Sequence, residues 1–405
     1  MNCEYEIKDN SGVSDYNRVK TVFFRNLGIV PIKSDGQIEM LSFEEGASSQ
    51  DKTPDSDFPF VEHPLNSEAA KIFAKPEFLK NYFENEGFET HTPRRIVNRD
   101  GSTLFISAGV QRLERIYMNE EPVPSRGIYV AQPVFRTQYV GQAGEGFSSS
   151  FVNVCIESVN KGVETHFQNL QKIFTLFDNL GLDRKGFQFI SDQQESVWGE
   201  HKHVQKRVKI FFQGLEIGDA ILIEGFPQKT RESLEISDIG LGYERIKWIL
   251  KGGSYWGDTI DASQENHTHN TKDAIKTLTL LAGSGVVPHY KNHGYRFRLL
   301  SKKLVEELTT GESRVGINDL FSYYYKYWNG WTNLEVAENI SLQRIQDENV
   351  RNFNNELISR LKIFYEGVDV DINRPTNQLV KLLRGTPADS NKVQGIINDM
   401  GGQLL

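Results

Sequence analysis

Residues 132–154, QPVFRTQYVGQAGEGFSSSFVNV, constrain the fold more than any other stretch of the chain. They hold two segments rich in β-branched and aromatic residues, separated by a turn rich in glycine and serine. This pattern predicts two strands that pair antiparallel across the loop 139–150. The return strand, FVNVCIESV, is expected to lie beside the strand that carries Phe135 and Arg136.

The segments on either side of this hairpin predict an α+β fold. Apolar residues at helical spacing, each run ending at a glycine, predict helices over 15–28, 77–87 and 163–180. Alternating segments predict further strands at 187–191, 206–213 and 219–225. Strands that cluster in this way, with helices between them, favour an antiparallel sheet flanked by helices over a βαβ repeat.

The C-terminal part of the chain has a different pattern. Residues 271–284, 294–309, 340–366 and 376–400 are helical in period, with polar or Pro- and Gly-containing segments between them. An α-helical domain is therefore expected to follow the sheet.

Two changes of pattern divide the chain into three parts. The stretch from Ser42 to Asn66 is rich in Glu, Ser, Asp and Pro and poor in aliphatic residues, which is typical of a linker. We therefore expect an N-terminal appendage and linker over 1–75, the sheet domain over 76–262 and the helical domain over 263–405.

Composition excludes several classes of protein. No run of about 18 apolar residues is present and the N-terminus lacks the apolar core of a secretory signal, so we expect a cytoplasmic protein without membrane contact. The two cysteines, Cys3 and Cys155, form no metal or disulfide pattern. A formal charge of −8 argues against general affinity for polyanions. Between Thr271 and Thr310, however, the chain has seven basic residues and three acidic ones, so a local basic surface is possible there.

Two segments have the residue types of a nucleotide site. In the hairpin, Arg136 is placed to present its guanidinium to a phosphate, and Phe151 on the return strand can stack on a purine. In LEISDIGLGYERIKWIL, residues 234–250, Asp238 and two glycines precede a helix that begins near Arg245. Glycines let a backbone approach a ligand, and a helix start receives phosphate. Taken singly, each segment also fits an ordinary turn with a surface arginine.

Together these segments resemble motifs 2 and 3 of class II aminoacyl-tRNA synthetases. The closest likeness is to alanyl-tRNA synthetase in its archaeal-type form. It is carried, in order, by FLKNYFENEGF, STLFISAGVQRL, YVAQPVFR, FFQGLEIGDAILIEGF, DIGLGYERIKWILKG and GSGVVPHYKNHGYRFRLL. The resemblance runs from about residue 77 to the C-terminus and covers neither the editing domain nor the C-terminal domain of that family. It implies a class II-type sheet followed by a tRNA-recognition domain.

The resemblance implies roles for residues in the ATP site. Arg136 would grip the α-phosphate of ATP, and Arg245 would hold the distal phosphates. Phe151 would stack on adenine, with Gln138 hydrogen-bonded to that base and Gly242 close to the nucleotide.

It also implies a site for a small amino acid, alanine or something close to it. Asp238 would receive the ammonium group, with Gly240 beside it and Trp198 as the wall that excludes larger side chains. Trp198 also fits a plain core position. Glu216 and Asp219 lie where a class II site could coordinate Mg²⁺, a cation that prefers carboxylate oxygens.

The acceptor is less clearly implied. PHYKNHGYRFRLL retains Asn292, Tyr295 and Arg298 of the segment that reads the tRNA acceptor stem in the family. Tyr290, His293 and Leu299 depart from that segment, and the motif 2 loop GQAGEGFSSS lacks the family's basic residues. These residues also fit helix packing without any tRNA contact.

Two activities and one non-catalytic role follow from the resemblance. The chain would activate a small amino acid as an aminoacyl-adenylate and transfer it either to tRNA or to a small metabolite or carrier protein. The alternative is a non-catalytic regulatory or tRNA-binding protein, although such a protein has no reason to keep both ends of an ATP clamp. Class II folds often pair through their first motif, so a homodimer is also implied, although monomeric members exist in the alanine branch.

Overall fold

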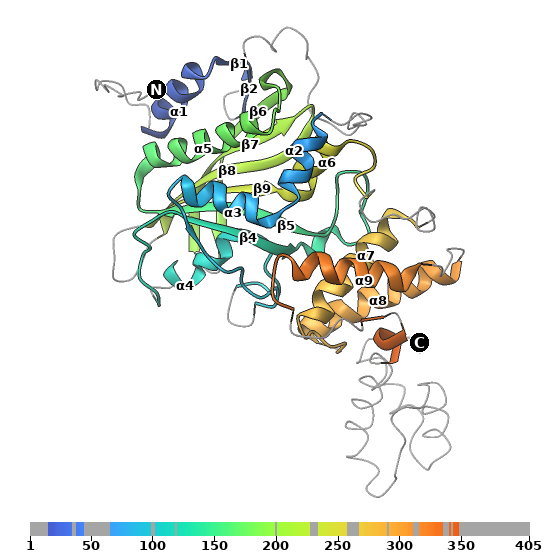
Figure 1. The fold of residues 1–405 in the computed structure, drawn as a ribbon. Coiled ribbons are helices and arrows are strands. Elements are labelled where there is room, and N and C mark those ends of the chain that lie inside the picture. Colours follow the sequence, from blue (N-terminus) through green and yellow to red (C-terminus); the bar gives the residue numbers. More distant parts are fainter. Residues whose placement is uncertain are drawn as a thin grey trace, which may run out of the picture.

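The computed structural model describes residues 15–34, 38–43, 65–98, 102–117, 120–198, 201–226, 234–256, 267–289, 291–310, 316–334, 340–341 and 343–347. Within these ranges the expected α+β fold is confirmed: a nine-stranded, mostly antiparallel sheet with flanking helices is followed by a helical region (Figure 1). In the same ranges, each helix is too short or too polar to cross a lipid bilayer.

The strands follow the order β1-β2-β6-β7-β8-β9-β5-β4-β3 across the sheet. Their bounds are β1 Ile29–Ser34, β2 Ile38–Phe43, β3 Glu89–Thr90, β4 Ile128–Phe135, β5 Ser150–Val159, β6 Phe187–Trp198, β7 His201–Phe212, β8 Leu215–Phe226 and β9 Leu234–Gly242. The short β3 pairs parallel with β4, and the other pairs are antiparallel. The predicted hairpin is confirmed, because β4 and β5 pair in register from Ile128↔Glu157 to Phe135↔Ser150.

The helices agree with the periodicity of the sequence in most places. They are α1 Asp15–Asn26, α2 Ser67–Phe73, α3 Pro76–Asn85, α4 Glu114–Tyr117, α5 Gly162–Asn179, α6 Tyr243–Lys251, α7 His269–Gly283, α8 Asn292–Thr310 and α9 Ile317–Asn329, with short 3-10 turns η1 Gly109–Leu113, η2 Thr137–Tyr139 and η3 Arg184–Gly186. Gly28 and Gly181, just beyond two of the predicted helices, have φ of +73° and +75°. Only glycine adopts that conformation readily, so both positions end their helices as expected.

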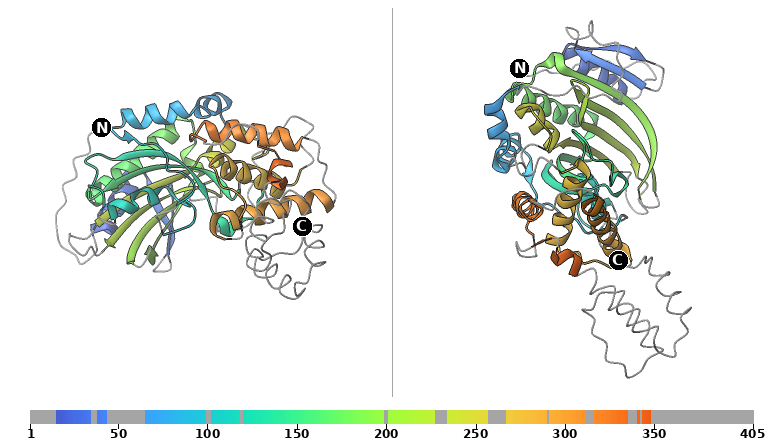
Figure 2. Two further views of the ribbon diagram at one scale, coloured as in Figure 1. Left: turned by 90° about the horizontal axis from the view of Figure 1, so that it is seen from below. Right: turned by 90° about the vertical axis from the view of Figure 1, so that its right-hand side faces the viewer.

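Alternation along the strands separates the two faces of the sheet. On β5, Val152, Val154 and Ile156 belong to the main apolar core, which includes residues of α1, α3, α5 and α6. The intervening residues of β5, from Phe151 to Glu157, point to the other face. Figure 2 shows this second face as a concave surface that the helices leave open over much of its width. Phe151, Asp238 and Gly240, which were selected from the sequence, point to this face.

Two predicted features differ from the structure. Residues 29–34 and 38–43, expected in an appendage and linker, form β1 and β2 and extend the main sheet through β6. Helix α9 was not expected, because INDLFSYYYKYWN is rich in tyrosine, yet its apolar residues are buried at helical spacing. Most of the predicted helix 340–366 and all of 376–400 lie outside the described residues, and the three domain boundaries stay predictions.

The basic segment predicted over 271–310 is also corrected. Lys272, Lys276 and Arg298 are 4%, 3% and 9% exposed. Three of its seven cations therefore lie inside the fold, and the basic face that remains on the surface is smaller than the sequence count suggests.

Candidate functional site

A cleft opens on the concave face, where β4, β5, β8 and β9 meet the start of α6. Its lining includes seven residues selected from the sequence: Arg136, Phe151, Glu216, Asp219, Gly240, Gly242 and Arg245. The two arginines come from segments about a hundred residues apart and meet here because β5 pairs with both β4 and β9.

Arg136 lies directly after β4, on the edge of the cleft. Its backbone N–H donates to the carbonyl of Ser149 at 2.8 Å, and its Nε donates to the carbonyl of Ser107 at 3.1 Å. The guanidinium lies 4.9 Å from the centre of the Phe151 ring. Among the described residues, its two terminal nitrogens have no hydrogen-bond partner, so they can meet an anionic ligand.

Arg245 occupies the first turn of α6, on another wall of the cleft. Its Nε donates to the carbonyl of Gly146 at 2.7 Å and its Nη1 to the carbonyl of Glu216 at 2.5 Å. The guanidinium also lies 5.9 Å from the centre of the Phe147 ring. These contacts join α6, β8 and the loop after β4, and they hold the charge at a fixed place.

Two carboxylates face the arginines across the cleft. Asp219 is half-buried, and desolvation, followed by the negative charge of Glu216, raises its pKa to about 6, while the charge of Arg136 acts in the opposite direction. Nζ of Lys209 lies 3.9 Å from Glu216. Two neighbouring carboxylates form the oxygen-rich donor set that Mg²⁺ prefers, so Glu216 and Asp219 fit the metal implied by the resemblance.

Asp238 lies on β9, one step further along the concave face than Gly240. Burial, and secondly the charge of Asp219, raise its pKa to about 8, while Arg136 acts in the opposite direction. Its Oδ1 has no hydrogen-bond partner among the described residues. Burying an unpaired carboxylate costs free energy, and a cationic ligand beside Asp238 would offset that cost.

Gly240 lines the cleft on β9. A Cβ at this position would lie 2.9 Å from Nδ2 of Asn153 and 3.6 Å from Oδ1 of Asp219. A larger residue would therefore displace Asn153 and fill the floor between the two strands. Glycine keeps this space open to a ligand, as the sequence predicts.

Gln138 and Trp198, like Asp238, are not among the residues that line the cleft. Gln138 is exposed in η2, and its carbonyl accepts a hydrogen bond from Gln142 at 3.1 Å. Trp198 stacks on Tyr117 at 5.6 Å and belongs to a second apolar cluster. Ile221 of that cluster pairs with Asp238, so Trp198 lies on the same side of the sheet as the acid. The roles proposed for Gln138 and Trp198 stay predictions.

The three candidate acceptor residues lie at the beginning of α8. Asn292 is exposed, with φ of +51°, and Tyr295 is half-buried. Arg298 is 9% exposed, and its guanidinium lies 5.8 Å from the Tyr295 ring. Arg298 is thus packed within the fold, whereas Asn292 and Tyr295 can meet a partner.

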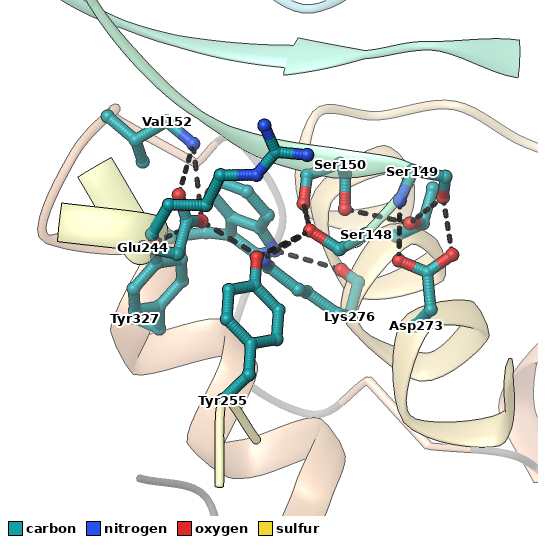
Figure 3. Close-up of polar contacts among 12 residues, drawn as sticks. Ser148, Ser149, Ser150, Val152, Glu244, Tyr255, Asp273, Lys276 and Tyr327 are labelled. Atoms are coloured by element: carbon teal, nitrogen blue, oxygen red, sulfur yellow. Dashed lines mark hydrogen bonds and ion pairs between the residues drawn. The ribbon is translucent and has the colours of Figure 1, made fainter. Parts of the chain in front are cut away.

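Two charged residues that the sequence did not single out join the cleft to the helical region (Figure 3). Glu244, next to Arg245, accepts hydrogen bonds from Nζ of Lys276 at 3.0 Å and from the Tyr327 hydroxyl at 2.6 Å. It also accepts from the backbone N–H of Val152, beside Phe151, at 3.1 and 3.2 Å. Glu244 lies within the motif DIGLGYERIKWILKG and could have been selected from it. Nothing in the sequence distinguished Lys276 from other helical lysines.

Helix α7 also contacts the loop after β4 directly. Lys276 Nζ donates to Oγ of Ser148 at 3.4 Å. Asp273 accepts from the backbone N–H and the hydroxyl of Ser149 at 2.8 and 2.6 Å. These groups are buried, so α7 fixes the loop that carries Phe147 and precedes Phe151.

No model of a known protein family matches this chain, and no curated protein matches it. The resemblance to alanyl-tRNA synthetases therefore rests on the short motifs quoted above. Membership of that family stays a prediction.

Proposed function

We propose that the chain activates a small α-amino acid, alanine or a close analogue, with ATP. The observation that carries the proposal is the meeting of Arg136, Phe151 and Arg245 with two carboxylates in one cleft. Two cations, an aromatic ring and a pair of metal-type acids are the groups that a nucleoside triphosphate with Mg²⁺ requires.

In the proposed reaction, a carboxylate oxygen of the amino acid attacks the α-phosphorus of ATP. The bond from that phosphorus to the bridging oxygen of the β-phosphate breaks, and pyrophosphate leaves with both electrons of the bond. Arg136 stabilises the negative charge that develops at the α-phosphate, and Arg245 binds the departing phosphates. No general base is needed, because the attacking carboxylate is already ionised. Mg²⁺ held by Glu216 and Asp219 would offset phosphate charge.

The second step transfers the aminoacyl group to an acceptor. The acceptor is either tRNA, bound near Asn292 and Tyr295, or a small molecule or carrier protein. The burial of Lys272, Lys276 and Arg298 supports a small molecule or carrier protein as the acceptor. Buried cations contact few phosphates and therefore displace few counterions from a nucleic acid.

Amino-acid-dependent exchange of labelled pyrophosphate into ATP tests the first step. We expect exchange with one or more amino acids of a panel that includes glycine, alanine, serine and asparagine. Charging of total tRNA by the same protein then distinguishes the two acceptor classes. A chain that binds ATP in calorimetry but supports no exchange with any amino acid would be a non-catalytic protein instead.

The pH dependence of amino-acid binding tests the role of Asp238. Because its pKa is raised to about 8, the carboxyl group is mostly protonated below that pH and cannot neutralise a substrate ammonium. The KM for the amino acid should therefore fall by roughly 25-fold as pH rises from 6.5 to 8.5, because the ionised fraction of a group with this pKa rises by about that factor over the range. Exchange kinetics at three pH values measure this change.

The variant Asp238→Asn serves as the control for this titration. Its amide keeps the shape of the side chain but cannot become anionic, so its KM should be high and nearly constant over the same range. A wild-type KM that does not change between these pH values would exclude Asp238 as the ammonium ligand.

A further inference from the structure

Three side chains beyond one end of the cleft carry buried polar atoms without hydrogen-bond partners among the described residues. They are Nε and Nη1 of Arg112, both carboxylate oxygens of Glu157, and Oδ1 of Asp238. A buried polar atom left unpaired costs about 1–3 kcal/mol, so such atoms are rare unless a ligand, ion or water meets them. The proposed reaction with ATP does not explain why so many unpaired polar atoms lie close together here.

These atoms lie on the same face of the sheet as the cleft. Glu157 on β5 pairs directly with Asp238 on β9, and the preceding pair on that face is Cys155 with Gly240. The next pair in the same direction, Asn153 with Gly242, lines the cleft. Carboxylate oxygens of Glu157 and Asp238 and the sulfur of Cys155 lie within 4.8 Å of one another. The cluster therefore lies next to the cleft, in the same row of residues along the two strands.

The turn η1 forms the roof of the cluster. The backbone N–H of Gly109 donates to Oδ1 of Asn153 at 3.0 Å, and a Cβ on Gly109 would collide with the sulfur of Cys155. Arg112, in the same turn, places its Nε 3.9 Å from Glu157, beyond hydrogen-bond distance. Its Nη2 is 2.6 Å from Nδ1 of His91, which fixes the guanidinium in this position. The guanidinium and the carboxylate thus face each other without a direct hydrogen bond.

The mixture of hydrogen-bond donors and acceptors decides which ligand suits this cluster. A thiol and two carboxylates are the donor set of a metal ion, but the N–H groups of Arg112 would then face a cation. The thiol of Cys155 is also covered by Gly109. A group that both accepts from Arg112 and donates to Glu157 satisfies each side. Hydroxyl and carboxamide groups have this property.

We propose that Arg112 and Glu157 form the subsite for the side chain of the amino-acid substrate, and that this side chain is short and ends in a hydroxyl or carboxamide group. The inference rests on the proposed function and on Asp238 as the ammonium ligand. Among small amino acids, this subsite would bind those with a polar side-chain end more tightly than alanine and glycine. A site whose buried polar groups are left unpaired by an apolar analogue rejects that analogue strongly.

Calorimetry on the full chain, with α,β-methylene-ATP present, tests the inference without relying on catalysis. Serine, asparagine, alanine and glycine are the probes, and the relative affinities of serine and asparagine show which polar group is preferred. We expect the better of these two to bind at least tenfold more tightly than alanine, a conservative bound for a lost hydrogen-bonding partner.

Two variants locate the effect. In Arg112→Met/Glu157→Leu both charges are replaced by apolar groups, so alanine should bind at least as tightly as the polar amino acids. Glu157→Gln, which keeps the size of the side chain, should reduce the preference at least ~threefold, because hydrogen bonds to charged groups are the stronger ones. Glu224→Gln is the matched control: this acid lies on β8 of the same sheet, is paired with Lys206 at 2.6 Å, and should leave the preference unchanged.

Several outcomes would overturn the inference. Alanine or glycine binding as tightly as serine and asparagine would exclude a polar subsite, while the proposed activation reaction would stand. Zn²⁺ or Mg²⁺ binding that disappears in Glu157→Gln would make the cluster a metal site. If the nucleotide binds but no amino acid does, the subsite has no substrate to select. Failure of the nucleotide itself to bind would reject the proposed function as well.

Discussion

Replacement of Arg136 by alanine is expected to lower kcat/KM for pyrophosphate exchange by at least ~100-fold, which is the usual loss when one charge-stabilising donor is removed from a transition state. The terminal nitrogens of this guanidinium face the cleft, and its hydrogen bonds to the protein join it to Ser107 and Ser149. The Ser149 contact uses the backbone N–H and survives the change. The fold should therefore be retained, which thermal unfolding of the variant can check.

Arg115→Ala is the matched control for this experiment. Arg115 is exposed on α4, pairs with Glu120 and Glu121 at 3.2 Å, and does not line the cleft. Surface ion pairs contribute little to stability, so both exchange and thermal unfolding should stay close to wild type. Exchange at the wild-type rate in Arg136→Ala would show that this arginine does not contact the reacting phosphate.

The hairpin and its neighbours could be predicted because their residues carry local signals. Alternating apolar residues and a glycine-rich turn identified β4 and β5, and glycines after apolar runs marked the ends of α1 and α5, where the structure gives them positive φ. The two arginines were selected by the same means, from glycines and arginines close together in the sequence. Their convergence in one cleft needed the pairing of β5 with both β4 and β9, which follows from the order of strands in the sheet.

Other features depend on contacts between distant segments, which no local pattern records. Glu157 is a lone acid in the apolar strand FVNVCIESV, and only its register against Asp238 shows that the two acids face each other. Lys276 reads as an ordinary helical lysine, yet it is buried against Glu244, 32 residues earlier. Helix α9 was missed because tyrosines favour strands, whereas packing against α7 determines its structure here.

Lys276 gives the helical region a role in the cleft that does not depend on the acceptor. Its ammonium group contacts Glu244, beside Arg245, and Ser148, in the loop after β4. The rings of Trp256, Tyr327 and Trp328 surround it at 5.5 to 5.9 Å. One buried cation from α7 therefore joins the two segments that supply the arginines, which suggests that both must be docked on α7 for the clamp to form.

Lys276→Met is accordingly expected to destabilise the protein and weaken nucleotide binding together. Removing one partner of a buried ion pair leaves the other charge unpaired, which typically costs about 3–5 kcal/mol. The cost should lie near the lower end, because Tyr327 and Val152 still donate to Glu244. The affinity for ATP should fall at least ~tenfold, because a partly detached loop must be ordered on binding at a cost of at least 1.4 kcal/mol.

Denaturant unfolding and calorimetry with ATP, at a temperature where the variant remains folded, measure the two effects. Lys71→Met, which removes an exposed lysine paired with Glu68 at 2.7 Å, should change the free energy of unfolding by less than about 0.5 kcal/mol. Adding Glu244→Gln to Lys276→Met removes the unpaired charge and should recover part of the lost stability, so a double-mutant cycle isolates the pair. If Lys276→Met unfolds more easily but binds ATP with wild-type affinity, α7 stabilises the fold without holding the clamp.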